Sequence, residues 1–259
     1  MIKRVDFKIN ELENMRKYPK ELFFTGATHL LKKRKISIIG SRKPNLYAQD
    51  KTAVLARKLS SSGICIVSGG AIGVDAIAHR SAGTKNTIMI AATGLDKRYP
   101  AINKNLISDI ESEGLVLSQF KEGSPSTRYN FVLRNELVVA LGDVLIVTYA
   151  DLNSGSMRSV EYALAMGKEI YVLSHRIGES EATNNLLLEG KAKAIYDIDA
   201  FVRDFSGEEQ SATVKSDDFL EFCKSNPRYE EALQKYPNRV FEAELSGEIE
   251  IKNGVCKLL

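Results

Sequence analysis

The sequence has few cysteines, and they lie far apart. Its 259 residues contain three, Cys65, Cys223 and Cys256, an odd number without a C-x-x-C pair. Neither a zinc site nor a disulfide framework is therefore expected. Cys65 lies in the apolar run 64–67, so we expect it to be a buried, small hydrophobic residue.

Long apolar segments are also missing. No stretch approaches eighteen apolar residues, so no membrane-spanning helix and no membrane partner are expected. The first ten residues, MIKRVDFKIN, lack the apolar core and cleavage pattern of a signal peptide. We therefore expect a cytoplasmic protein. Its hydrophobic fraction of 44% and charged fraction of 27% exclude a largely disordered or fibrous chain.

Charge is unevenly distributed, although the formal net charge is only +3. Residues 206–259 hold seven basic and eleven acidic residues, a net charge of −4, whereas the residues before them hold 29 basic and 22 acidic residues, a net charge of +7. This asymmetry favours a polyanionic partner for the first part of the chain. For the acidic tail it favours a different partner, which we expect to be a protein.

Short apolar runs rich in β-branched residues recur through the first two hundred residues. Most are continuous rather than alternating, which is typical of strands buried on both faces of a parallel sheet. Helical patterns separate them at 49–60, 74–82 and 158–166, the last followed by Gly167 as a C-terminal cap. The alternation predicts an α/β fold, a Rossmann-like and mostly parallel sheet with helices on both faces. The predicted strands are 36–39, 64–67, 87–91, 115–117, 144–147, 170–173 and 194–196.

The composition changes after residue 205. Residues 206–216, SGEEQSATVKS, have the composition of a linker. Beyond it, short helices are predicted, followed by a hairpin around Asn253-Gly254, which is a strong turn signal. The predicted organisation is a lead segment 1–35 that packs on the main domain, a Rossmann-like domain 36–205, the linker 206–216, and a winged-helix-like domain 217–259. In that last domain the predicted helices are 217–224, opened by Ser216 as N-cap, 228–236 and 238–245, and the predicted strands are 248–251 and 255–259.

Glycine and hydroxyl residues follow four of the predicted strands. Ligands of an open parallel sheet bind at the carboxyl ends of its strands. Glycine lets backbone N–H groups approach an anion closely, and helix N-termini behind such loops add partial positive charge. We therefore expect one phosphate-binding surface built from the loops 40–42, 68–73, 93–94 and 153–156.

The loop 68–73 nearly matches a dinucleotide-binding fingerprint. Ser68 stands where its first glycine belongs, however, and the next predicted strand ends in Ala91-Ala92 instead of a ribose-binding carboxylate. The chain also has no G-x-x-x-x-G-K-[ST] motif. Neither NAD nor ATP is therefore expected, and we predict no cofactor.

Residues suited to catalysis are sparse. Asp75 and His79 lie one helical turn apart, so they form either an acid–base pair, a metal half-site, or a structural pair in which Asp75 supports the helix N-terminus and bonds His79. The structural interpretation is favoured. No H-E-x-x-H motif or carboxylate cluster is present, so we predict binding rather than turnover, with no metal site.

Residues 119–135 interleave cations with aromatic residues. Single-stranded nucleic acids need cations for their phosphates and aromatic faces for their unstacked bases. Phe131 is either such a stacking residue or a core residue, and the spacing leaves both open. The residues concerned are Lys121, Arg128, Tyr129, Phe131 and Arg134.

Taken in order, several segments resemble the DNA-processing protein A family, also called DprA or Smf. The resemblance covers about residues 18–200, and its motifs are specific as an ordered set. It implies a Rossmann-like protein that binds single-stranded DNA, is not an enzyme, protects incoming DNA in natural transformation, helps to load the RecA recombinase and forms a homodimer. The matching segments are Tyr18-Pro19, 22–26, 38–42, 67–75, Ala78-His79, 94–96, Tyr99-Pro100, Asn103, Leu117-Ser118, Phe131, Arg134-Asn135, 154–156 and 185–187.

The resemblance also implies a set of nucleic-acid-binding residues. Arg42, Ser68, Gly69, Ser154 and Ser156 would hold phosphates. Arg128 and Arg134 would add cationic contacts, and Phe131 would stack on a base. The full implied set is Ser41, Arg42, Ser68, Gly69, Gly70, Lys121, Arg128, Phe131, Arg134, Asn135, Ser154, Gly155 and Ser156.

Two other functions compete with this one. Hydrolases that release a base from nucleoside monophosphates share the Gly-Ser-Arg loop, but they need a Pro-Gly-Gly-x-Gly-Thr loop where this chain has Asn-Ser-Gly-Ser at 153–156. A transcription regulator would read duplex DNA with the winged helix. The net charge of −4 on the tail argues against that role, because duplex binding depends on cationic contacts to phosphate.

Overall fold

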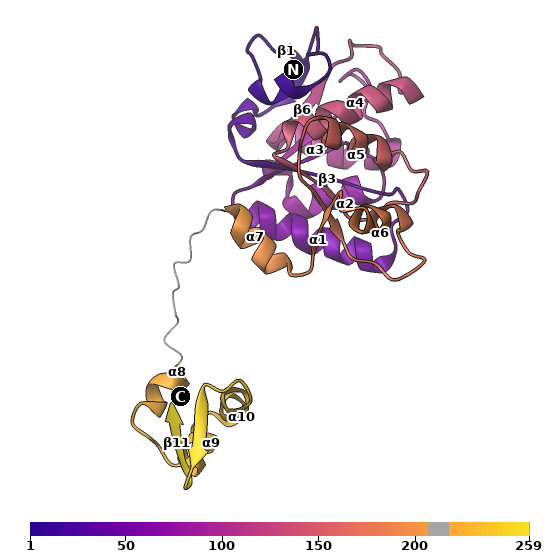
Figure 1. Cartoon of the computed structure of the whole chain (residues 1–259). Helices are drawn as coiled ribbons and strands as arrows, with labels where there is room; N and C mark the ends of the chain where they lie inside the picture. The colour runs from indigo at the N-terminus through magenta and orange to yellow at the C-terminus, as the bar shows by residue number, and fades with distance from the viewer. Residues whose placement is uncertain (207–217, 259) are drawn as a thin grey trace. The chain divides into compact units, whose positions relative to one another are not determined.

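The computed structural model describes residues 1–206 and 218–258, which belong to two compact units (Figure 1). Apart from Ser206, the predicted linker 206–216 lies outside the described residues, and so does the predicted cap Ser216. Ser206 itself ends the last helix of the first unit.

A single nine-stranded sheet forms the centre of the first unit, in the order β1-β2-β6-β5-β4-β3-β7-β8-β9. Neighbours from β6 to β9 are parallel, whereas β1 and β2 run antiparallel at one edge. The strand order reverses at β3, whose neighbours are β4 and β7. The strands are β1 Lys3–Arg4, β2 Phe23–Gly26, β3 Lys35–Ile39, β4 Cys65–Ser68, β5 Thr87–Ile90, β6 Leu115–Ser118, β7 Val144–Val147, β8 Ile170–Leu173 and β9 Lys193–Ile195.

Helices cover both faces of this sheet, and Figure 1 shows α1 and α7 on the side opposite to α4 and α5. Successive strand residues point to opposite faces, so Ile38 and Ile66 pack under α1, α2 and α7, while Ile39 and Val67 pack under α4, α5 and α6. The helices are α1 Leu46–Ser61, α2 Val74–Ala82, α3 Lys104–Glu113, α4 Arg128–Leu141, α5 Ser156–Ala165, α6 Glu181–Leu188 and α7 Ile198–Ser206.

The predicted fold class is confirmed: the chain is α/β, with a mostly parallel sheet and helices on both faces. Each predicted strand corresponds to a strand of the structure with similar bounds, and Cys65 is fully buried as expected. The N-terminal segment 1–35 supplies β1 and β2, which the apolar pattern did not predict because both are short strands near the sheet edge. The long helix α4 was also not predicted as such, because its first residues are polar.

The second unit consists of short helices followed by a hairpin. Asn253 and Gly254 have positive φ angles of 54° and 72°, as a two-residue hairpin turn requires. A small apolar core that includes Phe219, Val240 and Ile249 joins the helices to the hairpin. The winged-helix assignment stays a prediction. The elements are α8 Asp218–Cys223, α9 Tyr229–Lys235, α10 Pro237–Leu245, β10 Ile249–Lys252 and β11 Val255–Leu258.

The described residues show neither a membrane-spanning helix nor a metal-binding cluster. No helix there combines the length and the hydrophobicity needed to cross a membrane. Within the same residues, no cluster of three or more histidine, cysteine, aspartate or glutamate side chains is placed to hold a metal ion.

Candidate nucleic-acid interface

A cavity of about 400 Å³ opens where the strand order reverses, at the carboxyl ends of β3, β4 and β7. This is the position at which open parallel sheets bind ligands. The loops after these three strands line it, together with one face of α4. The sequence-predicted residues among its lining are Ser41, Arg42, Phe131, Arg134, Asn135, Ser154, Gly155 and Ser156.

The loop after β3 is held by backbone contacts on both sides. The Ser41 N–H donates to the Tyr149 carbonyl at 2.8 Å, and the Val74 N–H at the start of α2 donates to the Ser41 carbonyl at 3.1 Å. Gly73 makes the second contact possible, because it has a φ of +82° and a Cβ there would overlap the Ser41 carbonyl. The loop therefore presents the exposed side chain of Arg42 from a fixed backbone.

The floor of the cavity contains a buried arginine. Arg134 is 5% exposed, and its Nη1 lies 3.7 Å from Oδ2 of Asp75, which is also buried. Burial raises the pKa of the Asp75 carboxyl and lowers that of the Arg134 guanidinium, while the opposite charge of each partner counteracts the shift. The nearby Arg42 lowers the pKa of Arg134 further, because the two cations repel each other. An anion placed near both would relieve this repulsion.

Phe131 lies between the two arginines. The guanidinium carbon of Arg42 is 5.5 Å from the centre of its ring, and that of Arg134 is 5.9 Å away. Tyr99 lies alongside at 5.8 Å between ring centres, and it is 43% exposed. Phe131 is only partly buried, so its ring is not a closed core contact. Aromatic surface and cationic charge therefore meet at one place.

The loop after β7 leads into α5 and contributes small polar groups. The Ser154 Oγ is shielded from solvent and has no hydrogen-bond partner among the described residues. Asn135 of α4 donates its Nδ2 to the Gly155 carbonyl at 3.4 Å, which ties α4 to this loop. Ser156 opens α5, and the N-terminus of a helix carries partial positive charge. This side of the cavity suits a phosphate oxygen.

Ser68, Gly69 and Gly70 are buried beneath the cavity instead of lining it as donors. The Ser68 hydroxyl donates to the Ile38 carbonyl at 2.7 Å, so it ties β4 to β3. Gly69 makes room for Arg134, because a Cβ at this position would overlap the guanidinium. Gly69 also lines the small cavity beside Arg42 and Phe131, and the phosphate contacts expected of Ser68, Gly69 and Gly70 stay predictions.

Two predicted cations lie away from the described lining. Lys121 is exposed and its Nζ lies 3.2 Å from a carboxylate oxygen of Glu21. Arg128 is exposed at the first residue of α4, with Thr127 as N-cap. Neither lines the cavity. Their contact with nucleic acid stays a prediction.

The predicted loop 93–94 contributes a later residue to the site than Thr93 or Gly94. Thr93 is buried, and Gly94 packs against the backbone of Lys121. The residue that reaches Phe131 is Tyr99, further along the same loop, where it lines a small adjoining cavity with Arg42. The sequence indicated Tyr99 only through the Tyr99-Pro100 dipeptide, one of the segments that resemble the family. Lys43 and Asp151 also line the main cavity, and no motif in the sequence indicated them.

Asp75 and His79 do not form an acid–base pair. Asp75 accepts a hydrogen bond from the Ala71 N–H at 3.3 Å, near the start of α2, and faces Arg134. His79 is fully buried with its Nδ1 2.6 Å from the Thr87 hydroxyl. Burial lowers the pKa of His79 to about 3. The structural interpretation of this pair is favoured, although the partner of His79 is Thr87 and not Asp75.

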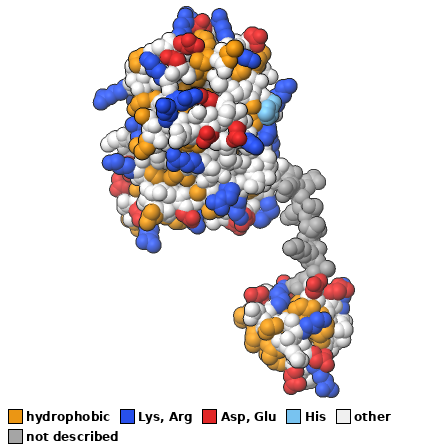
Figure 2. All heavy atoms as spheres, turned by 180° about the vertical axis from the view of Figure 1, so that it is seen from behind, with side chains coloured by type: hydrophobic (Ala, Val, Ile, Leu, Met, Phe, Trp, Pro, Cys, Tyr) orange, Lys and Arg blue, Asp and Glu red, His pale blue; other side chains and the backbone are white. Residues whose placement is uncertain are grey.

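On the face of the first unit seen in Figure 2, lysine and arginine side chains alternate with acidic and apolar ones. At the cavity, Asp75 compensates the charge of Arg134, and the exposed Arg42 and Lys43 remain on the rim, opposed there by Asp151. Positive charge is therefore local, which suits a ligand held by a few phosphate contacts.

Comparison with protein families matches most of the first unit. The model of the family described as DNA recombination-mediator protein A matches residues 6–206. Protein Smf of Escherichia coli is 32% identical over 178 residues, which are 67% of this chain and 48% of that protein. DNA processing protein DprA of Streptococcus pneumoniae is 34% identical over 177 residues, 66% of this chain and 62% of that protein. The chain spans about half the length of the curated relatives it matches.

Two solved structures share both fold and sequence with the chain. One comes from a study of the single-stranded DNA binding mode of DNA processing protein A from Helicobacter pylori. It is 38% identical, with a TM-score of 0.79, and the match covers 81% of this chain and 98% of that one. The X-ray structure of DprA from Streptococcus pneumoniae is 30% identical, with a TM-score of 0.71, and the match covers 77% and 72% of the two chains.

Proposed function

The chain belongs to the DNA recombination-mediator protein A family, and from this premise we propose that it binds single-stranded DNA in the cavity at the carboxyl ends of β3, β4 and β7. The observation that carries the proposal is the contact of the half-buried Phe131 with Arg42 and Arg134. Single strands offer phosphates and free base faces at the same time, and this arrangement matches both.

Each group has a distinct part in the proposed complex. The guanidinium of Arg42 is exposed and can fork onto a phosphate. When it does, it leaves a face of Phe131 to a base, and stacking on aromatic side chains tolerates any base. Arg134 is fixed by Asp75, and its guanidinium lies beside the ring of Phe131. The start of α5 offers the Ser154 hydroxyl to a second phosphate oxygen.

We propose that this site binds without turnover. Among the described residues that line the cavity, the carboxylates are Asp75, which faces Arg134, and the exposed Asp151. His79 lies nearby but is fully buried and neutral near pH 7, since its pKa is about 3. These groups are not arranged as a general acid and base around a common point.

We further propose a setting for this binding from the family membership. The protein acts in the cytoplasm as a homodimer, protects incoming strands in natural transformation and helps RecA to assemble on them. The acidic second unit binds a protein partner instead of DNA, because its net charge repels phosphates. The loading step is tested by the rate of RecA filament assembly on single-stranded DNA, measured with and without this protein. We expect faster assembly in its presence.

A fluorescence-polarisation titration tests DNA binding itself. We expect a labelled single strand to bind at least about tenfold tighter than the matching duplex, with little sequence preference. Unlabelled nucleoside monophosphates should compete weakly, since each fills one contact of several. Equal affinity for duplex and single strand would overturn the proposal, and release of free base from a monophosphate would indicate a hydrolase.

A further inference from the structure

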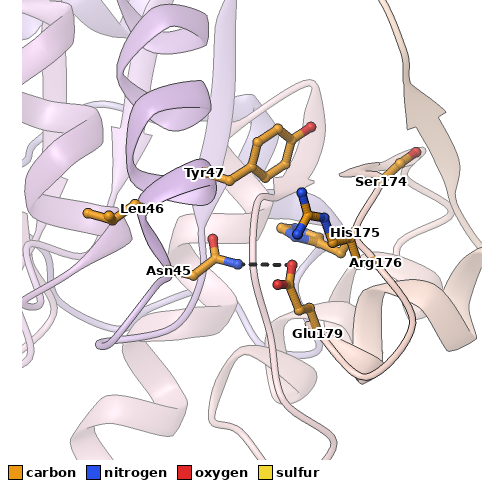
Figure 3. Close-up of a pocket in the computed structure, with 7 residues that line it drawn as sticks. All are labelled: Asn45, Leu46, Tyr47, Ser174, His175, Arg176 and Glu179. Carbon is orange, nitrogen blue, oxygen red and sulfur yellow. Dashed lines mark hydrogen bonds between the residues drawn. The ribbon is translucent and has the colours of Figure 1, made fainter.

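A second cavity, of about 510 Å³, lies at the same edge of the sheet and is not used by the site described above. Its lining comes from the start of α1 and from the loop after β8. Figure 3 shows Tyr47 on one wall and His175 and Arg176 on the facing wall, with a hydrogen bond between Asn45 and Glu179 at one end. Aromatic and cationic groups therefore face the same space again.

The aromatic wall of this cavity is held in place but remains accessible. Tyr47 is 43% exposed, and its ring meets His175 edge to face at 5.5 Å. His175 is fixed in turn, because its Nε2 lies 2.8 Å from the Thr148 carbonyl and its ring packs against Tyr149 at 5.2 Å. A half-exposed aromatic ring with a rigid support is a stacking platform.

Polar groups around the Tyr47 ring suit the phosphate and the base of a nucleotide. The side chain of Arg176 is exposed, so a cation is available for a phosphate. Lys51 lies 6.0 Å from the centre of the Tyr47 ring and pairs with Asp50 at 3.0 Å. Glu179 accepts a hydrogen bond from Asn45 at 3.2 Å. A carboxylate repels phosphate but accepts hydrogen bonds from N–H groups on base edges, so the base belongs on the Glu179 side and the phosphate beside Arg176.

The two cavities are adjacent along the chain. Lys43 lines the first cavity and Asn45 lines the second. Two residues of even fully extended chain span at most about 7 Å. A strand that leaves the first cavity over this loop therefore meets the second cavity within its next nucleotides.

We propose that the cavity between Tyr47 and Arg176 is a second nucleotide subsite, which stacks a base on Tyr47 and extends the path of the single strand beyond Phe131. This inference rests on the proposed function, because it continues the same strand. It predicts that affinity depends on length: an oligonucleotide of about two nucleotides fills the first cavity alone, whereas one of about twelve reaches both.

Polarisation titrations of the full chain with dT2 and dT12 test the subsite. Tyr47→Ala should weaken dT12 binding about tenfold, the loss of one stacked base, and leave dT2 affinity unchanged. Arg176→Ala should flatten the salt dependence for dT12 by about 0.7 in log–log slope. Tyr196→Ala removes an 87% exposed tyrosine that lines neither cavity, and it should change neither titration.

The outcomes separate the two proposals. If Phe131→Ala weakens dT12 binding while Tyr47→Ala leaves it unchanged, the subsite is wrong and the first cavity stands. An equal loss for dT2 and dT12 in Tyr47→Ala, with unchanged melting, would place Tyr47 in the first cavity and overturn the length argument. If the unsubstituted protein binds neither oligonucleotide, the proposed function fails and the subsite falls with it.

Discussion

The two units of the chain differ in where their charged side chains lie. The first unit buries charged side chains, such as Arg134 at 5% and Asp75 at 6% exposure, beneath the candidate interface. In the second unit, the buried side chains among residues 218–258 are all apolar, and its acidic residues lie on the surface. A buried charge is costly unless it is paired. The larger unit fixes such a pair in its core, and the pair lies at the floor of the candidate interface.

The largest expected effect tests that buried pair. Asp75→Ala leaves the Arg134 charge buried without its partner, so we expect the free energy of unfolding of the first unit to fall by about 3–5 kcal/mol. Urea unfolding followed by circular dichroism should show this loss in one transition, while the transition of the second unit stays in place. The double variant Asp75→Ala with Arg134→Met, which removes both charges, should recover much of the stability. A shift of both transitions together would show that the units do not unfold independently.

The next effect distinguishes the aromatic group from the exposed cation. Phe131→Ala removes a stacking surface worth about 1–3 kcal/mol per base, and it should leave the salt dependence of single-strand binding nearly unchanged. Arg42→Ala removes a phosphate contact, so it should weaken binding and flatten the log–log salt slope by about 0.7. Titrations at several salt concentrations and thermal melts measure both. Normal affinity in a destabilised Phe131→Ala protein would make Phe131 a core residue, and unchanged affinity in Arg42→Ala would remove the main anchor of the site.

A smaller effect depends on pH. All three histidines lie in the first unit, and burial lowers the pKa of His79 to about 3. The unfolded chain takes up this proton near pH 6.5, so it binds more protons than the folded unit between pH 6.5 and 3. The contribution of His79 to the free energy of unfolding is therefore fully present above pH 6.5. It decreases as the pH falls below 6.5, by at most about 1.4 kcal/mol per pH unit.

Unfolding at pH 7 and pH 5.5 measures this difference. The first unit should lose stability between the two values, whereas the second unit, which has no histidine, should remain nearly constant. His79→Gln removes the titrating group, so it should reduce the pH dependence of the first unit. The same dependence in His79→Gln as in the unsubstituted protein would assign it to another group.

The smallest effect concerns the second unit. The cavity is lined entirely by residues before position 206, so a chain of residues 1–206 should bind single strands within about twofold of the full chain. A titration of the truncated chain, accompanied by a melting curve to show that it is folded, gives the answer. If the truncated chain is folded but does not bind DNA, the second unit is the part that binds it.

Local sequence patterns were sufficient for much of this architecture. Continuous apolar runs predicted the seven parallel strands, because a strand buried on both faces needs apolar residues at every position. Asn253-Gly254 predicted the hairpin, because few residues adopt the required positive φ. Ser41, Arg42 and residues 154–156 were placed at one sheet edge from the rule that ligands bind beyond the carboxyl ends of parallel strands.

Long-range contacts decided the rest. Asp75 and Arg134 belong to different helices and meet only because α2 and α4 both approach the same edge. The same packing buries Ser68 and places Gly69 against the Arg134 guanidinium. It also brings Tyr99 to Phe131 and His175 to Tyr47. Local residue patterns specify which segments become strands or helices and where their ends lie. Only the packing of distant segments decides which side chains at those ends are covered, which are paired, and which face a cavity.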